Sequence, residues 1–279
     1  MTTSTSSEVS ARDVTTVSLS LDSSELAEKY DTLSNLQLAN GKYLVTELGI
    51  RRGQRVLDIG AGTGRLAAYV AKLVDDPALV SAIDPLPLRI ALARRKLGPQ
   101  AKLVVGRAED LSAFGDSSFD YAYFNAVYHW IPDQPTALRE ATRVLKRGGR
   151  LGITTGDKEH ENAIQSITER ILQRLQYSGV LPREWLPYRV SESILRQQFE
   201  AAGLVPQLIK VRHFVDYFAS AEEVLEFNAS SSFGNFLSEL PRDIAARVRT
   251  AIVNELETLW TTPGIPIERH TIFAMAEKP

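Results

Sequence analysis

The segment Arg55–Arg65, which reads Arg-Val-Leu-Asp-Ile-Gly-Ala-Gly-Thr-Gly-Arg, restricts the possible folds more than any other part of the chain. It begins with a short apolar run, broken only by Asp58, that predicts a buried strand. A glycine-rich turn comes next, with Gly60, Gly62 and Gly64. Glycine lets a turn close tightly and lets a ligand approach the backbone. Because a helical pattern begins at Leu66, we expect free N–H groups at a helix N-terminus to face a nucleotide-like ligand.

The spacing of these glycines separates two uses of this arrangement. Dinucleotide-binding folds carry G-x-G-x-x-G, whereas here the second and third glycines are one residue closer together. The acid at Asp58 suits a ligand that carries an ammonium group and would repel a pyrophosphate. With these features the segment resembles the class I S-adenosylmethionine-dependent methyltransferases. The resemblance implies a cofactor loop that contains Asp58, Gly60, Ala61, Gly62 and Gly64.

A second acid follows the next predicted strand. Ala78–Ile83 is apolar and ends at Asp84-Pro85. A carboxylate about 20 residues beyond such a loop is placed to bind the hydroxyls of a ribose. The resemblance therefore implies that Asp84 and Pro85 contact the cofactor. The alternative is that Asp84 only caps the helix expected over Leu86–Leu97.

The third motif is an acidic turn after a predicted strand that begins at Lys102 and ends in Gly106. It resembles the adenine-binding segment of the family. The resemblance implies a backbone contact from Ala108 and a side-chain contact from Glu109, with Asp110 as an alternative side chain. A solvated acidic turn is the other interpretation.

The fourth motif lies in Ser118–Asp133, where Phe119–Phe124 predicts a strand. Open α/β sheets bind ligands outside the carboxyl ends of their strands, which is where the chain turns outward here. The resemblance implies that Asn125 and Ala126 line the methionine part of the cofactor. It also implies that Tyr128-His129-Trp130 faces the transferred methyl group.

The remaining elements complete one α/β fold. An amphipathic helix is expected over Thr136–Leu145, with the glycines of Lys146–Gly149 as its C-cap. Later strands are expected over Leu151–Thr155, Leu204–Phe218 and Arg269–Glu277. The resemblance implies that the last of these inserts antiparallel between the two before it. The predicted fold is a Rossmann-like seven-stranded sheet, mostly parallel with an antiparallel last strand, helices on both faces, and helical lid insertions.

This pattern divides the chain into a cofactor-binding half and later additions. The expected segments are a disordered leader (1–23), the cofactor-binding half (24–156), a lid segment (157–190), a core helix and strand (191–218), a helical lid insertion (219–264) and the last core strand (265–279). Ser24 is expected to cap the first helix. Tyr30 is either a gate over the methionine end of the cofactor or an ordinary packed tyrosine.

Aromatic residues are frequent in the expected lid and beside it. Candidates for a pocket lining are Trp185, Tyr188, Phe214, Tyr217, Phe218, Phe227, Phe233, Phe236 and Trp260. Apolar and aromatic linings with a few polar groups are typical of pockets for small organic molecules. At least half of these side chains are expected to form the core of the lid itself.

Composition excludes several classes of partner and site. The net charge of −2 gives no nucleic-acid footprint, and no apolar run approaches the roughly 18 residues of a membrane span. The absence of cysteine excludes disulfides and thiol nucleophiles and fits a reducing, cytoplasmic setting. The four histidines lie far apart in the sequence, so no metal site is expected. Neither a secretory nor a transit pattern is expected in residues 1–23, and the sequence does not indicate an oligomeric state.

The acceptor decides whether a base is needed. A phenol, an alcohol or an activated carbon must lose a proton, whereas a carboxylate is already a nucleophile. His129 is the candidate base, because its motif lies beside the reacting methyl group and imidazole titrates near neutrality. The alternative is a structural, hydrogen-bonded histidine, and His213 is a second candidate base.

Within the family, the segment Asn125–Asp133 most resembles the trans-aconitate, malonyl-acyl-carrier and quinone-biosynthesis methyltransferases. We therefore expect an S-adenosylmethionine-dependent enzyme that methylates an oxygen, hydroxyl or carboxylate, of a small and fairly apolar metabolite. Two other classes stay open: an enzyme of this fold that catalyses a cyclisation or isomerisation without methyl transfer, and a non-catalytic protein that senses the cofactor. The glycine spacing disfavours a dinucleotide-dependent oxidoreductase.

Overall fold

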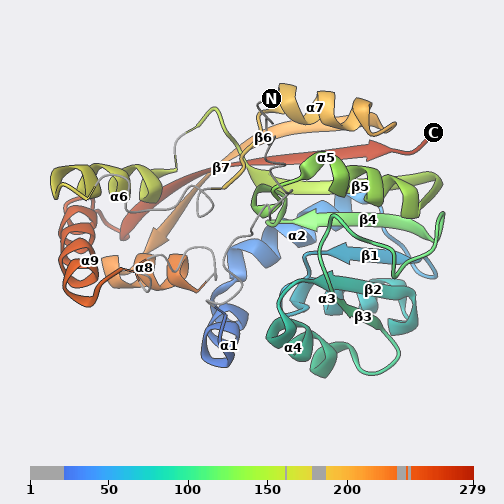
Figure 1. Cartoon of the computed structure of the whole chain (residues 1–279), viewed down its shortest axis with the longest axis horizontal. Coiled ribbons are helices and arrows are strands. Elements are labelled where there is room, and N and C mark those ends of the chain that lie inside the picture. The colour runs from blue at the N-terminus through green and yellow to red at the C-terminus, as the bar shows by residue number, and fades with distance from the viewer. Residues whose placement is uncertain (1–21, 161, 178–186, 231–236, 238–239) are drawn as a thin grey trace, which may run out of the picture.

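The computed structural model describes residues 22–160, 162–177, 187–230, 237 and 240–279. Its centre is a seven-stranded sheet with the order β3-β2-β1-β4-β5-β7-β6 (Figure 1). The strands are β1 (Val56–Ile59), β2 (Val80–Asp84), β3 (Lys102–Val105), β4 (Phe119–Asn125), β5 (Leu145–Gly156), β6 (Val205–Phe218) and β7 (Ile265–Glu277). Strands β1 to β5 pair in parallel, whereas β7 is antiparallel to both β5 and β6. The predicted Rossmann-like sheet with its inserted antiparallel strand is confirmed.

Helices cover both faces of this sheet (Figure 1). They are α1 (Ser24–Leu33), α2 (Asn35–Leu48), α3 (Arg65–Val74), α4 (Pro87–Leu97), α5 (Gln134–Val144), α6 (Ala163–Arg174), α7 (Glu192–Ala201), α8 (Ala221–Ala229) and α9 (Arg242–Glu257). Two short 3-10 helices, η2 (Pro77–Leu79) and η3 (Tyr128–Trp130), lie in loops. One hydrophobic cluster joins α2, α3 and α4 to the sheet, and a second joins α5 and α7 to the opposite face.

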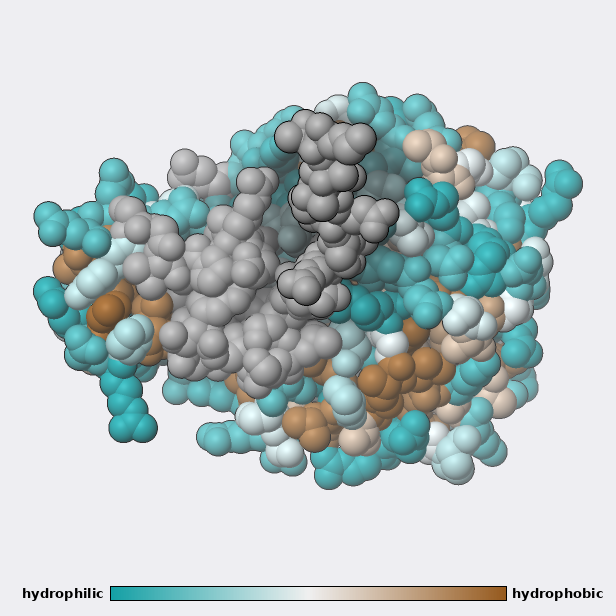
Figure 2. All heavy atoms as spheres, in the orientation of Figure 1, coloured by the Kyte–Doolittle hydropathy of each residue, from teal (hydrophilic) through white to brown (hydrophobic). Residues whose placement is uncertain are grey.

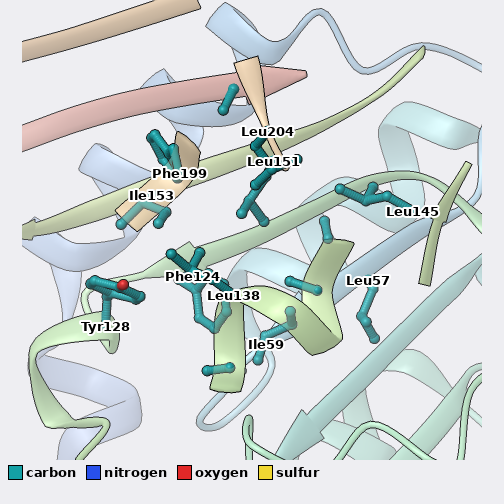
Figure 3. Close-up of a cluster of buried hydrophobic side chains, with 14 of the residues drawn as sticks. Leu57, Ile59, Phe124, Tyr128, Leu138, Leu145, Leu151, Ile153, Phe199 and Leu204 are labelled. Atoms are coloured by element: carbon teal, nitrogen blue, oxygen red, sulfur yellow. The ribbon is translucent and has the colours of Figure 1, made fainter. Parts of the chain in front are cut away.

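Figure 3 shows the second cluster, in which strand residues such as Leu57 and Ile153 pack with Leu138 of α5 and Phe199 of α7. Strand β1 is buried along its whole length. Burial on both sides explains why its sequence is almost continuously apolar rather than alternating. The one polar residue of that strand, Asp58, is therefore held in a buried position.

Two helix ends differ from the sequence prediction. Ser23, and not Ser24, caps α1, because the Ser23 hydroxyl accepts a hydrogen bond from the Leu26 N–H at 3.1 Å. Helix α5 ends at Val144, and β5 already begins at Leu145, so the glycines of Lys146–Gly149 are no C-cap.

The end of α5 is satisfied by a lysine from the other end of the chain. The Lys278 ammonium donates to the carbonyl oxygens of Thr142 and Leu145 at 2.8 and 2.7 Å. A lysine can satisfy the last carbonyls of a helix in place of a glycine cap. The Gly148 N–H donates instead to the Lys278 carbonyl at 2.7 Å.

A third hydrophobic cluster lies outside the sheet proper. Helices α6, α8 and α9 pack there against the ends of β6 and β7 that are remote from the core, around residues such as Ile171, Val224 and Ile252. In Figure 1 this unit stands beyond the carboxyl ends of β1, β4 and β5. We call α6, α8, α9 and these strand ends the lid. The predicted helix over Phe233–Glu239 lies almost entirely outside the described residues, as does nearly all of the predicted leader.

The face shown in Figure 2 is mostly hydrophilic, with apolar residues gathered mainly over the region of α4 and β3. Within the described part of the chain, no helix combines the length and the apolar character that crossing a membrane requires.

Candidate functional site

Three adjoining cavities form one groove along the carboxyl edge of the sheet, and all three are lined by Gly60. The first cavity has Tyr30, Asp58, Ala61, Gly62 and Asn125 in its wall. The central cavity, of about 190 Å³, is lined by residues that include Tyr30, Gly62, Asp84, Pro85, Asn125, Ala126 and Trp130. The third contains Pro85, Ala108 and Glu109. The structure thus places every sequence-predicted cofactor residue except Gly64 in one groove.

The glycine loop has two different structural tasks. Gly60, Gly62 and Gly64 all have positive φ, at 80°, 54° and 77°. A Cβ on Gly64 would lie 2.6 Å from Ala93 Cβ and 2.8 Å from its Cα, so this glycine lets α3 approach α4 and does not line the groove. At Gly62 the nearest atom to such a Cβ is Cε1 of Tyr30, at 3.6 Å, in the groove wall.

Asp58 supplies a buried carboxyl group to the first cavity. It accepts a hydrogen bond from the Tyr123 hydroxyl at 2.8 Å. Burial raises the pKa of the Asp58 carboxyl to about 7, against the opposing effect of this hydrogen bond, and the charge of Asp84 adds to the rise. Such a group is poised to ionise when a cation binds beside it.

Asp84, at the end of β2, fixes the glycine loop and also faces the groove. One carboxylate oxygen accepts the Gly62 N–H at 2.8 Å, and the other accepts the Leu86 N–H at 2.9 Å. Burial is the main cause of a raised pKa for this carboxyl group, although both hydrogen bonds lower it. Leu86 is the N-cap residue of α4, so Asp84 holds the turn before the helix and does not cap its first N–H groups.

The third cavity is mainly apolar, with Ile83, Val127 and Ile131 in its wall. Glu109 is its acidic side chain, and its Oε2 lies 3.7 Å from the Arg107 Nε. Asp110 is absent from the wall and accepts the Ser112 N–H instead.

The turn after β4 is held in a strained conformation by a threonine of β5. Ala126 has φ of 56°, which is uncommon for a residue other than glycine. The Thr154 hydroxyl accepts the Ala126 N–H at 2.9 Å and donates to the Asn125 side chain at 2.8 Å. Asn125 in turn donates to the Gln37 carbonyl of α2 at 3.0 Å. These bonds position the wall of the groove, where strain of this kind commonly accompanies a functional site.

Tyr30 of α1 covers the glycine loop, is half-buried, and places its ring centroid 4.3 Å from the Arg89 guanidinium. Burial is the largest cause of its raised pKa. Arg89 also lies 3.4 Å from Asp22, with both side chains almost completely buried.

The segment Tyr128–Trp130 does not face the groove as a unit. Trp130 lines it, but Tyr128 points into the core and donates from its hydroxyl to Gln198 at 2.8 Å. His129 is in none of the three cavity walls, and its Nδ1 lies 3.1 Å from the Thr155 hydroxyl. Burial and the nearby charge of Arg189 lower the pKa of His129 to about 3, so the imidazole is neutral at neutral pH.

Of the sequence-predicted pocket aromatics that the structure describes, most are absent from the walls of the three cavities. Phe227 of α8 lines the central cavity. Phe218 packs in the lid cluster and Phe214 packs against the sheet, whereas Tyr217 and Trp260 are exposed. The backbone of Tyr188 binds to His129 and Gln134. Trp185, Phe233 and Phe236 lie outside the described residues.

Several groove residues were not predicted from the sequence. Gln37 and Arg89 line it, and the Gln37 Oε1 is buried without a hydrogen-bond partner in the described structure. Arg89 carried a readable signal, because it lies four residues before Ala93 on the buried stripe of α4. Gln37, between two leucines of α2, carried none.

Three of the four histidines stack on one another, and none of the three lines the described cavities. The His270 ring stacks between His160 and His213, with centroid distances of 3.9 and 4.6 Å. His213, the second candidate base, also lies 3.1 Å from Glu268 and is half-exposed. The described residues contain no group of histidines and carboxylates arranged to hold a metal ion.

Comparisons with known proteins identify the domain. Residues 57–153 match the model of a methyltransferase domain. An uncharacterised methyltransferase of Mycobacterium tuberculosis is 38% identical over 106 residues, 38% of this chain and 41% of the relative. A demethylmenaquinone methyltransferase of Staphylococcus aureus is 33% identical over 131 residues, 44% of this chain and 54% of the relative. The chain therefore spans only about half of the curated relatives it matches.

The similarity of solved structures concerns the fold. The [4+2]-cyclase SpnF, for example, has a TM-score of 0.56 and 19% identity, over 87% of this chain and 81% of that protein. The matched segment runs from β1 to β5 and contains the loop and strand ends that build the groove. The motif set, the methyltransferase domain matched over residues 57–153 and the fold together support the class I S-adenosylmethionine-dependent methyltransferase family.

Proposed function

We propose that this protein binds S-adenosylmethionine in the groove and transfers its methyl group to an oxygen of a small, fairly apolar metabolite. The observation that carries the proposal is the order of groups along the groove: a buried acid, a glycine loop, a second acid and an apolar slot. The residues fit the cofactor, because each group has a complement in an ammonium, a ribose or a purine ring.

In this proposal Asp58 faces the ammonium group, Asp84 faces the ribose hydroxyls, and Ala108 and Glu109 contact the adenine. Bound S-adenosylmethionine supplies an electrophilic methyl carbon. The chain contributes by orienting the two reactants, since well-oriented reactants can gain roughly 7–11 kcal/mol. Asn125, Ala126 and Trp130 lie where the methionine part and the acceptor meet.

The surroundings favour a carboxylate acceptor over a hydroxyl. A hydroxyl needs a base, but His129 lies outside the described groove walls and has a pKa of about 3. The apolar side chains of Val127 and Phe227 in the wall of the central cavity suit the apolar body of such an acceptor. We propose that His129 positions the wall through Thr155 and does not take a proton.

The first test is calorimetric titration with S-adenosylmethionine and, separately, with S-adenosylhomocysteine. We expect micromolar binding of both, weakened by about 1–3 kcal/mol in Asp84→Ala through lost hydrogen bonds to a charged group. A folded protein that binds neither ligand would refute the proposal.

The second test is release of S-adenosylhomocysteine with a panel of carboxylic acids and their matching alcohols. Methylation of acids by both the wild type and His129→Gln would support a carboxylate acceptor. Methylation of alcohols that His129→Gln abolishes, with unchanged cofactor affinity, would restore the role of His129 as base. Cofactor binding without turnover of any panel member would favour a cyclase, an isomerase or a sensor.

A further inference from the structure

Arg189 carries a guanidinium group that the described structure leaves largely unused. The residue follows Tyr188 and is partly buried between the end of β5 and helix α6. Within the described residues it makes one hydrogen bond, from Nη2 to the Gln165 Oε1 at 2.8 Å. A guanidinium has five N–H donors in a planar fork, so most of them have no partner.

The nearby carboxylates do not pair with this group. Asp157 and Glu169 are close enough to raise the pKa of Arg189, while burial lowers it more. In the described structure, neither carboxylate forms an ion pair with the guanidinium, since the separation of their charged atoms exceeds 4.0 Å. Gln165 stands between Arg189 and Glu169, since its own Nε2 donates to the Glu169 Oε1 at 2.9 Å. Keeping a charged group partly buried without a direct ion pair is costly.

The position of Arg189 connects it to the proposed site. A Cβ on Gly156, the last residue of β5, would lie 3.6 Å from the Arg189 Nε. Two residues earlier in the same strand, Thr154 holds the Asn125 side chain in the groove wall. The Tyr188 N–H donates to the His129 carbonyl at 2.7 Å, and the His129 ring lies 5.0 Å from the ring of Trp130, centroid to centroid. Arg189 is therefore placed one layer beyond the groove, on the lid side.

We propose that Arg189 binds an anionic group, a carboxylate or a phosphate, at the end of the acceptor remote from the transferred methyl group. The planar fork matches both anions in a bidentate way that a lysine cannot. The inference rests on the proposed function and narrows its substrate class to acceptors with an apolar body and a distal anion.

The test uses straight-chain α,ω-diacids, from adipate to dodecanedioate, against monoacids of equal length. Binding to the full-length protein saturated with S-adenosylhomocysteine is measured by calorimetry. We expect one or more diacids to bind at least about tenfold more tightly than the matching monoacids, as expected for hydrogen bonds to a charged group. Arg189→Gln should remove this preference, and Arg189→Lys should retain only part of it.

Three controls separate the outcomes. Arg196→Gln changes an exposed arginine of α7 and should leave the preference intact. Inorganic phosphate alone should compete with the diacid and not with the monoacid. If phosphate binds but the protein shows no preference for diacids, Arg189 binds free anions, and the proposal that it binds the acceptor is overturned. A diacid preference that survives in both Arg189 variants, or no binding by any acid, would also overturn it. Failure to bind S-adenosylhomocysteine itself would instead refute the proposed function.

Discussion

The Asp58 carboxyl group links cofactor binding to pH. Its pKa of about 7 means that roughly half of it is protonated at neutral pH in the unliganded protein. A cation at this position favours the ionised form, so binding should release a proton. The observed affinity should therefore fall as pH drops below 7, by at most about tenfold per pH unit, and level off above 7.

Calorimetry in phosphate and in Tris measures this release, because the buffers differ in ionisation enthalpy. We expect about half a proton released per cofactor bound at pH 7. Asp58→Asn should bind more weakly and lose the difference between the buffers. A wild-type enthalpy that is the same in both buffers would contradict the assignment of Asp58 to the ammonium group.

The neutral imidazole of His129 makes folding sensitive to acid. Its folded pKa of about 3 lies below the usual value of 6.5, so the unfolded state binds the extra proton between these two values. Stability from this residue is complete above pH 6.5 and is lost as pH falls toward 3, by up to about 1.4 kcal/mol per unit. Urea unfolding at pH 7 and pH 5.5 should show a smaller loss in His129→Gln. The same loss as in the wild type would show that His129 is not shielded, and His213→Gln is the exposed control.

Among single residues, the sequence predicted the groove residues that lie at the carboxyl ends of strands. Asp58, Asp84 and Asn125 lie at or near strand ends, where the periodicity breaks, and local patterns locate such breaks. Gln37 was not predicted, and Phe227 was only one of nine candidate aromatic residues. Their places in the groove depend on how α2 and α8 pack against the sheet, and no local pattern encodes that packing.

The glycine loop should separate folding from binding. Gly64→Ala places a methyl group 2.8 Å from the backbone of Ala93, so α3 and α4 must move apart. With the added cost of a positive φ, about 1–2 kcal/mol, we expect a clear loss of thermal stability. Gly62→Val has a similar energetic cost from its positive φ, but a Cβ at this position has no backbone atom nearby. This variant should therefore fold and lose affinity for the cofactor.

Melting temperature and calorimetric affinity for S-adenosylhomocysteine, measured on both variants, test this separation. A Gly64→Ala protein of wild-type stability would contradict the packing role of Gly64. A Gly62→Val protein with wild-type affinity would contradict the contact of Gly62 with the cofactor.

Helix and strand order followed from periodicity, because each core element has its own apolar pattern. The end of α5, in contrast, could not be predicted from the sequence pattern. Glycines usually stop a helix. Here the Lys278 side chain, more than a hundred residues later in the sequence, donates hydrogen bonds to the carbonyl oxygens at the end of the helix. The residues after Val144 are thereby free to begin β5 at once.

The whole molecule has a lid that is packed separately from the sheet, and its stability should be separable too. Ile252 of α9 is completely buried in the lid cluster. Ile252→Ala should cost the lid about 2–5 kcal/mol. Hydrogen exchange should then quicken in α6, α8 and α9, while β1 to β5 keep their protection.

Ile153→Ala is the matched control, because that side chain is equally buried but belongs to the sheet. It should quicken exchange in the sheet and its helices. Equal acceleration everywhere in both variants would show one cooperative unit, with no lid of its own.

Strands β6 and β7 pair from Val205–Glu277 at one end to Phe218–Ile265 at the other, with one shift of register between Pro206 and Leu208. These two strands belong to the seven-stranded sheet, and their remote ends extend beyond it into the hydrophobic cluster of α6, α8 and α9. On the proposed function, replacing the helices carried by these strand ends would change which acceptors reach the groove and would leave its cofactor-binding residues in place.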